Sequence, residues 1–537
     1  MRRTWLIGAL GVVLIAGIVG AFVVVSNNDD GSGRPDLGQP RKGGALRVAV
    51  VNLQTLDPAR ALEPSAVMVA DQLFDTLVRY DGQSGGIEAS VAGAWESSFD
   101  QRRFTFTIQD GLRFHDGTPL TAEDVKASID RIAAPGSESQ LRFQLETVDG
   151  YAAFHDERTA KDLSGVKVVA ANKLSIELTQ PFAQFPLVLA NPGFGVVPSE
   201  KVGEIAFGEA PVGSGPLKFA GRNGDVISLI RVDEYLPQPT FLDGVDLHLM
   251  SDPNNAFDAL KKGEVDLAPV PPDRVNEAAA EYGEPGFGPF AGVLFYGMNF
   301  EAPAFQDVRM RQAVIHAVDR ERIVEVVYDG TVVLADGFVP TGVPEVADNA
   351  CGARCAHDPG KARELVQAAF PGGNVPTVRI DFDEDSRQRA VASAIESDLK
   401  EVGIPTELRP HTLDDYRVFL VNDQPELFRL GWTADYLSAD AFLFPLFVTD
   451  QENNLMNLSA RDVDQKLRTA RAERDPERRA ELYRQIEQVV LDLAPVLPIA
   501  QFTNRWAAAA DVGGFAMTPL GTFDVTDVFL ARSTASG

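Results

Sequence analysis

The chain has little of what enzyme active sites and metal sites are usually built from. Its 537 residues include only two Cys and six His. The His lie far apart, with no pair at the four-residue spacing of a zinc-binding helix and no His-Glu-x-x-His segment. The glycine-rich stretch 210–219 lacks the Lys and the following helix of a phosphate-binding loop. We therefore predict no enzyme activity, no cofactor and no protein-held metal ion.

Basic residues are also scarce relative to acidic ones. The chain has 49 Lys and Arg against 77 Asp and Glu, a formal net charge of -28. A surface of this sign repels nucleic acids and anionic lipid headgroups, so partners of those classes are excluded. The acidity by itself does not identify a cationic ligand.

A single long apolar run is present, at the N-terminus. Arg2 and Arg3 precede Trp5 to Val25, a run without charge that would measure about 31 Å as a helix and could span a bilayer. We predict an anchor over residues 1–25 with the rest of the chain outside the cytoplasm. The alternative is a signal peptide cleaved after Ser26, which would give a secreted protein. Because no Cys follows the apolar run, lipid anchoring is excluded.

The remainder predicts a flexible linker and then a body of alternating strands and helices. Residues 26–44 are rich in Gly, Ser, Asp and Pro and have nothing to bury. The body is too long for one core, so two or three lobes are expected. Predicted strands include 46–51, 104–108, 166–169, 174–178, 378–382, 404–408 and 427–430, and helices include 391–402, 463–472 and 480–490.

The segment 104–126 has a particular order of local signals. Alternating residues on both sides of Asp110-Gly111 predict a hairpin, and a second Asp-Gly turn follows at Asp116. Thr121 and Asp124 form a capping box that opens a helix. His115 lies in the predicted hairpin and is expected at the surface.

The amino-acid sequence of this segment resembles the signature of family 5 solute-binding proteins. These proteins are the peptide, dipeptide and nickel receptors of ATP-binding-cassette importers. Further matches lie at 210–219, at 264–267 and in the Gly-Trp-x-x-Asp-Tyr segment that begins at Gly431. The resemblance covers about residues 43 to 500. It implies an α/β, two-lobed periplasmic-binding-protein-like fold with an extra subdomain, in a monomer that binds a ligand and delivers it to a membrane permease.

The same resemblance implies domain boundaries. Lobe I would comprise residues 45–285 and 502–537, with a β-rich subdomain at about 80–200, and lobe II would comprise residues 286–501. The lobes would be discontinuous and joined by a hinge near 285–300 and near 500, which closes on the ligand.

The Gly-Trp-x-x-Asp-Tyr segment implies the ligand site. In peptide-binding relatives the Asp at the position of Asp435 pairs with the ligand's amino group, and the neighbouring backbone pairs with the ligand as an added strand. Gly431, Trp432 and Tyr436 would line the site, and Asn52 would face them from lobe I. The chain departs from the family's Pro-Asp-Pro at Leu437-Ser438-Ala439, which leaves open whether the solute is a peptide or another small molecule.

Two further interpretations complete the prediction. Cys351 and Cys355 lie in one turn outside the membrane and are expected to form a disulfide. Besides the importer role, a tethered ligand-sensing ectodomain that acts with a separate signalling partner remains a possible function.

Overall fold

The computed structural model describes most of the chain beyond its N-terminal segment. The described residues are 37–61, 63–81, 86–236, 239–284, 286–423 and 425–531. The predicted anchor or signal peptide at 1–25 and most of the predicted linker at 26–44 lie outside the described residues. Within the described part, no helix has both the length and the apolar character needed to cross a bilayer.

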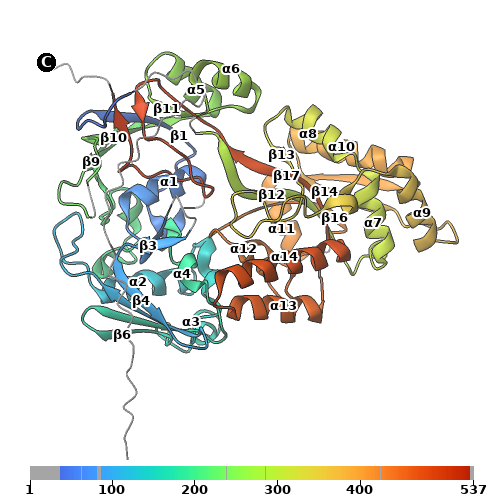
Figure 1. Cartoon of the computed structure of the whole chain (residues 1–537), viewed down its shortest axis with the longest axis horizontal. Coiled ribbons are helices and arrows are strands. Elements are labelled where there is room, and N and C mark those ends of the chain that lie inside the picture. The colour runs from blue at the N-terminus through green and yellow to red at the C-terminus, as the bar shows by residue number, and fades with distance from the viewer. Residues whose placement is uncertain are drawn as a thin grey trace, which may run out of the picture. The chain divides into compact units, whose positions relative to one another are not determined.

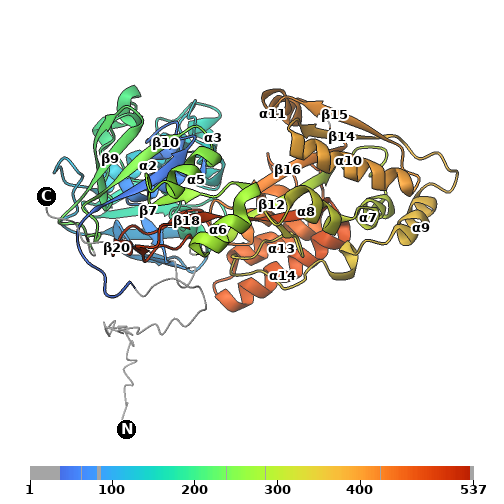
Figure 2. The same cartoon turned by 90° about the horizontal axis from the view of Figure 1, so that it is seen from above.

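A first six-stranded sheet combines early and late parts of the chain (Figure 1). Its order is β18-β11-β1-β10-β9-β8, with bounds Trp506–Ala508, Leu267–Pro269, Ala45–Val51, Gly244–Met250, Val226–Arg231 and Leu217–Asn223. β1 runs parallel to β10, and β18 runs antiparallel to β11. In Figure 2 the red β18 lies next to the green helix α6, Val275–Tyr282. The chain therefore returns to this sheet near its C-terminus.

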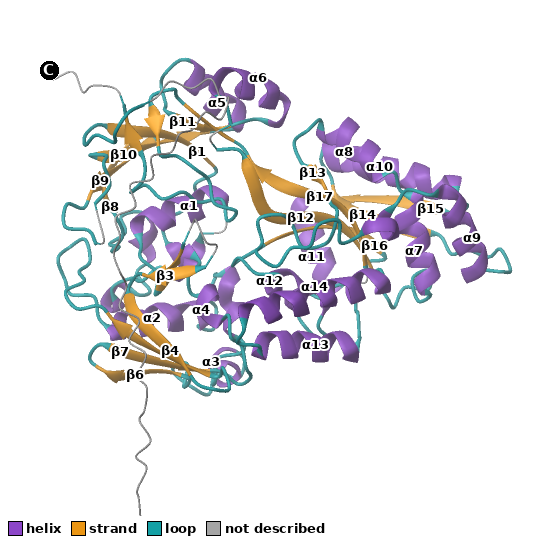
Figure 3. Cartoon of the chain, in the orientation of Figure 1, coloured by secondary structure: helices purple, strands orange, loops and turns teal. Residues whose placement is uncertain are grey.

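A second six-stranded sheet has the order β13-β17-β12-β16-β14-β15. The bounds are Val333–Leu334, Val496–Asn504, Gly288–Met298, Leu427–Thr433, Val378–Asp383 and Thr406–His411. Successive side chains of β12 point to opposite faces of the sheet, and both of these faces are buried. Val293 and Phe295 pack into one core cluster, and Leu294 and Tyr296 pack into another. Figure 3 shows α8 and α10 on one side of these strands and α13 and α14 on the other.

A four-stranded antiparallel sheet lies in the region predicted to be β-rich. Its order is β4-β5-β7-β6, with bounds Ala92–Ser97, Arg103–Ile108, Lys173–Glu177 and Val166–Ala170. β5 alternates buried Phe104, Phe106 and Ile108 with half-buried Thr residues, so one face packs inward. Helix α2, Ala122–Ala133, contacts β6 and β7.

One hydrophobic core joins this sheet to helices near the end of the chain. The helices are α12, Asp440–Phe447, α13, Arg461–Ala472, and α14, Pro476–Leu493. Phe106 and Ile129 belong to the same buried cluster as Phe447 and Ile486. Residues predicted for the β-rich subdomain thus share a core with residues predicted for lobe II, and the lobe boundaries remain a prediction.

Further helices flank the two larger sheets. They are α1, Pro64–Leu73, α5, Pro253–Lys261, α7, Val308–Ala317, α8, Arg320–Tyr328, α9, Pro359–Ala369, α10, Ser386–Glu401, and α11, Leu413–Asn422. Several begin at residues that cap free backbone N–H groups. The predicted capping box of Thr121 and Asp124 is confirmed, and Asp252 and Asp307 accept hydrogen bonds at the starts of α5 and α7.

The predicted hairpin at Asp110-Gly111 is wrong. β5 ends at Ile108, and the chain instead pairs Arg113 with Pro119 around the second Asp-Gly turn. The reason is that a strand has two edges, and those of β5 are already occupied by β4 and β7. β15 also begins two residues later than predicted, because Ile404 is buried and closes the end of α10 with a hydrogen bond to Leu399.

His115 is not the surface residue that was expected. Its side chain is half-buried and reaches the stretch 210–219, where both ring nitrogens lie within hydrogen-bonding distance of backbone atoms. Two segments that carry the family resemblance, 104–126 and 210–219, are therefore in direct contact.

Candidate ligand-binding site

Strand β16 has an open backbone edge. On one side it pairs with β12 along its whole length, from Leu427 to Thr433. On the other side β14 pairs only with Leu427 and Phe428. Among the described strands, none pairs with this second edge of β16 from Arg429 to Thr433.

The hydrogen-bond pattern between β16 and β12 determines which backbone N–H and C=O groups of β16 point toward the open edge. The N–H of Ala434 donates to the C=O of Ala291 at 2.8 Å, which makes these two residues a hydrogen-bonded pair. In an antiparallel ladder such pairs alternate with pairs that turn their N–H and C=O groups outward. Gly431 and Thr433 therefore direct these groups toward the open edge. Consistently, the Arg429 C=O accepts a hydrogen bond from the Tyr416 hydroxyl, at 2.7 Å, rather than from β12.

Asp435 stands just beyond the end of this edge. Its half-buried carboxylate accepts a hydrogen bond from Gln144 Nε2 at 2.8 Å, and its C=O accepts one from Asn191 Nδ2 at 2.8 Å. Among the described residues no Lys, Arg or His forms an ion pair with it. Burial raises the pKa of Asp435 to about 6, and the bond from Gln144 acts in the opposite direction. A carboxylate in this setting would gain from a cation.

The structure places the two aromatic residues of the segment differently. Trp432 is half-buried, donates from Nε1 to the C=O of Ala441 at 2.8 Å, and meets the ring of Phe143 edge-on at 6.4 Å between centroids. Tyr436 is only 1% exposed, and its hydroxyl donates to Asp440 at 2.7 Å. It is therefore an interior residue here, which lines the same small cavity as Phe143 and Gln144, and its role in a ligand wall stays a prediction.

Asp440 is the centre of a buried polar cluster. Besides Tyr436, the hydroxyl of Tyr483 donates to it at 2.8 Å, and Arg471 Nη2 lies 2.7 Å from its carboxylate. The Arg471 guanidinium also faces the rings of Phe182 and Phe444. This cluster anchors the start of α12 directly after the candidate site.

The other two predicted site residues are less tightly connected. Gly431 lies opposite Leu294, and a Cβ built on it would lie 3.6 Å from the ring of Phe502, an ordinary contact. Asn52 follows β1, is exposed and has a φ of 59°. No hydrogen bond between described residues joins Asn52 to Trp432 or Asp435, and its place opposite them stays a prediction.

A carboxylate does lie beside Leu437-Ser438-Ala439, where the family's Pro-Asp-Pro is absent. Glu345, 6% exposed, accepts hydrogen bonds from the Ala439 N–H at 3.1 Å and from Gln184 Nε2 at 3.0 Å. Burial raises its pKa. The acidic group beside this turn thus comes from a distant part of the chain.

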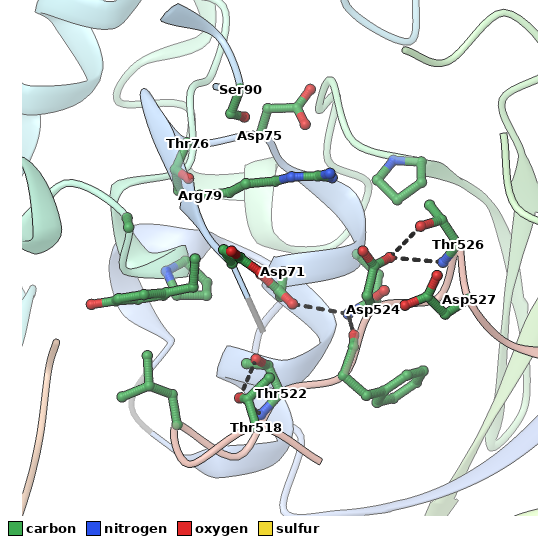
Figure 4. Close-up of a pocket in the computed structure, with 18 of the residues that line it drawn as sticks. Asp71, Asp75, Thr76, Arg79, Ser90, Thr518, Thr522, Asp524, Thr526 and Asp527 are labelled. Atoms are coloured by element: carbon green, nitrogen blue, oxygen red, sulfur yellow. Dashed lines mark hydrogen bonds between the residues drawn. The ribbon is translucent and has the colours of Figure 1, made fainter. Parts of the chain in front are cut away.

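A cavity of about 580 Å³ with an acidic lining adjoins the site (Figure 4). Its described lining includes six carboxylates, those of Asp71, Asp75, Asp81, Glu88, Asp524 and Asp527, and one arginine, Arg79. Burial raises the pKa of Asp71 to about 7 and that of Asp75 to about 6. The cavity reaches the Asp435 segment through Tyr80, whose hydroxyl accepts a hydrogen bond from the Leu437 N–H at 3.2 Å.

Sequence reasoning missed the residues that approach Asp435 from the other side. Gln144, Asn191 and Tyr80 lie more than 240 positions before Asp435, and no local pattern marks them. Arg429 was also missed. It shares the open strand with Gly431, pairs with Asp383 at 3.3 Å, and has a buried Nε without a hydrogen-bond partner.

The structure also gives the positions of the two Cys and of the side chains that could bind a metal ion. Cys351 and Cys355 lie side by side with Cα atoms 5.6 Å apart, a separation that a disulfide accommodates. Among the described residues, no group of three or more His, Cys, Asp or Glu is arranged to hold a metal ion.

Known proteins resemble this chain over nearly its whole length. Residues 86–454 match the family described as bacterial extracellular solute-binding proteins, family 5. The chain belongs to this family. The oligopeptide-binding protein OppA of Bacillus subtilis is 26% identical over 97% of this chain and 98% of its own. The glutathione-binding protein GsiB of Salmonella paratyphi A is 26% identical over 89% of this chain and 93% of its own.

A solved structure agrees with the fold. Clavulanic acid biosynthesis oligopeptide binding protein 2 superposes with a TM-score of 0.81 at 24% identity, covering 93% of this chain and 97% of the other. The predicted two-lobed α/β fold is thereby confirmed. Family membership makes the chain a solute-binding receptor that acts outside the cytoplasm, in a family of receptors rather than enzymes.

Proposed function

We propose that this receptor captures a short peptide with a free amino terminus and delivers it to an ATP-binding-cassette permease. The observation that carries the proposal is the carboxylate of Asp435, which has no cationic partner among the described residues and stands at the end of an open strand edge. Two of the proteins named above, OppA and clavulanic acid biosynthesis oligopeptide binding protein 2, bind oligopeptides by their names, which supports the same ligand class.

The amine would be held at Asp435. One carboxylate oxygen accepts from Gln144, while the other has no hydrogen bond among the described residues. An ammonium group there would offset the cost of burying the charge and form a charge-assisted hydrogen bond.

The peptide backbone would follow the open edge. Gly431 and Thr433 present N–H and C=O groups at the spacing of a strand, so an extended peptide could add itself as a further strand. Main-chain pairing does not depend on side chains. The five residues from Arg429 to Thr433 span roughly 13 Å, which matches about four peptide residues.

The adjoining cavity would influence which peptides are preferred. Six carboxylates against one arginine create a negative potential near the site. Peptides with basic or neutral side chains should therefore bind better than acidic ones.

Calorimetry with tetra-alanine and N-acetyl-tetra-alanine tests the amine anchor. The free-amine peptide should bind, and acetylation should weaken binding by about 2 to 5 kcal/mol, as expected when one member of a charge pair is removed. Asp435→Asn should produce a similar loss for the free-amine peptide, and Asp348→Asn, at an exposed position, should leave affinity unchanged. Equal binding of both peptides would contradict the proposal.

Three features of the remaining chain belong to the same proposal. Residues 1–25 act as a retained anchor, so full-length protein should leave the membrane with detergent but not with high salt.

Cys351 and Cys355 form a disulfide, so alkylation should increase the intact mass by two alkyl groups only after reductant is added. The receptor works as a monomer with the lobe boundaries given above, which scattering in solution would check.

A further inference from the structure

Residues 142–144 reach across to the strand segment that carries Asp435. They belong to the short helix Gln140–Leu145, which precedes the four-stranded sheet's second pair of strands. Arg142 Nη2 lies 3.2 Å from Glu452 Oε1, Phe143 meets Trp432, and Gln144 donates to Asp435. Three consecutive side chains thus contact three residues of the segment 432–452.

Gln144 differs from its two neighbours in this contact. Arg142 and Glu452 form a partly exposed ion pair, with 33% and 62% of their side chains accessible, and such pairs contribute little. Gln144 is 8% exposed, and its amide is the group that touches the proposed ligand anchor. It donates to Oδ2 and therefore leaves Oδ1 for an incoming amine.

We propose that Gln144 is a positioning residue for ligand binding: it fixes the Asp435 carboxylate toward the amine and couples amine binding to the docking of residues 140–145. This inference rests on the proposed function. A ligand amine and Gln144 would share one carboxylate, so each strengthens the other's hold on it, since a fixed and ionised carboxylate is a better acceptor for both.

The chemistry of the amide explains why this position suits the role. An amide N–H stabilises the ionised carboxylate without adding a charge, so the negative charge remains available to the ligand. A Lys or Arg here would neutralise Asp435 in the empty receptor and compete with the amine. A Glu would repel it.

A double-mutant cycle on the full chain tests the coupling, with tetra-alanine as the probe. Gln144→Leu should weaken binding at least fivefold in the wild-type background and less than twofold in the Asp435→Asn background. It should also raise the pH at which binding is half lost, because a hydrogen bond to the ionised form is removed. Gln180→Leu removes an amide from the small cavity that Gln144 also lines without touching Asp435, and should change neither quantity.

A second variant guards against misfolding. Gln144→Glu keeps the shape but replaces the donor by an acceptor, so its loss of affinity should be larger at pH 8 than at pH 5.5. Equal weakening by Gln144→Leu in both backgrounds would assign it to the fold alone and overturn the inference. No weakening by Gln144→Leu, with Asp435→Asn still harmful, would also overturn it but leave the proposed function intact. No effect of Asp435→Asn would overturn both.

Discussion

His115 and Gly213 are joined twice. The N–H of His115 donates to the C=O of Gly213 at 2.8 Å, and the N–H of Gly213 donates back to Nδ1 of the imidazole at 3.2 Å. Because Nδ1 accepts, Nε2 carries the proton and donates to the C=O of Gly215 at 3.1 Å. This geometry needs the neutral imidazole, and burial correspondingly lowers the pKa of His115 to about 4.

This link predicts a loss of stability in mild acid. The folded pKa lies below the unfolded value, so the unfolded state takes up a proton first and the stabilisation falls as the pH drops from about 6.5 toward 4. His115→Gln should be less stable than wild type at pH 7.5, and the difference should shrink toward pH 4.5. Urea unfolding over this range measures it.

Two points make that measurement specific. Asp71 and Asp75 have raised pKa values, so their contribution to stability falls as the pH rises, whereas that of His115 increases. Only the difference in unfolding free energy between variant and wild type is therefore informative. His357→Gln, which replaces a His whose side chain is 40% exposed, is the comparison variant. A difference for His115→Gln that is constant with pH would show that the imidazole titrates normally.

Ligand affinity should depend on pH through Asp435. Its pKa of about 6 in the empty receptor means that the carboxylate is ionised above this pH and protonated below it. Binding of tetra-alanine should be nearly constant above pH 7 and fall by up to about tenfold per unit below pH 6. Calorimetry between pH 5 and 8 checks this. The affinity of the Asp435→Asn variant for tetra-alanine should be weaker and should not change with pH. A flat profile for wild type would mean that Asp435 does not hold the amine.

Asp71→Asn should stabilise the protein at alkaline pH. The folded pKa of about 7 lies well above the ordinary value of an Asp carboxyl group, so the ionised carboxylate costs stability above pH 7 and the cost disappears as the pH falls toward 4. The variant should gain about 1 to 3 kcal/mol at pH 8 and much less at pH 5, after allowance for partial exposure. Thermal unfolding at the two pH values measures the gain. An equal gain at both values would exclude ionisation as its cause.

Arg471→Met should be strongly destabilising. The substitution leaves the fully buried Asp440 without its cation, although both Tyr hydroxyls can still donate to it. Breaking such a buried pair costs about 3 to 5 kcal/mol. Arg478→Met, which removes an ion pair whose Arg side chain is 76% exposed, is the matched control and should cost less than about 0.5 kcal/mol. Similar unfolding midpoints for the two variants would refute the role given to the cluster.

The sequence predicted what is decided locally. The capping box at Thr121 depends on residues three positions apart, and strand 104–108 depends on alternation within five residues, so both are legible without the rest of the chain. The hairpin at Asp110-Gly111 failed because the edges of β5 are filled by strands that the local pattern does not identify.

The candidate site shows the same limit. The Gly-Trp-x-x-Asp-Tyr segment was found because its residues are contiguous. Gln144 and Glu345 approach it from distant positions, and an isolated Gln or Glu carries no signal of what it will face. The burial of Tyr436 could not be predicted, because a strand-to-helix turn does not reveal which side chains turn inward.

The core shared by the four-stranded sheet and helices α12–α14 has a consequence for how the receptor is made. Residues 92–177 leave the ribosome and the export machinery long before residues 440–493. Helices α12–α14 in this later segment complete the core of the four-stranded sheet. Until then Phe106 and Ile129 lack the partners that cover them in the finished protein. Contacts between such distant segments slow folding and prolong the exposure of apolar surface. We therefore expect the emerging chain to need chaperone protection on the outer side of the membrane, and truncations before residue 493 to be degraded rather than to accumulate as a folded N-terminal domain.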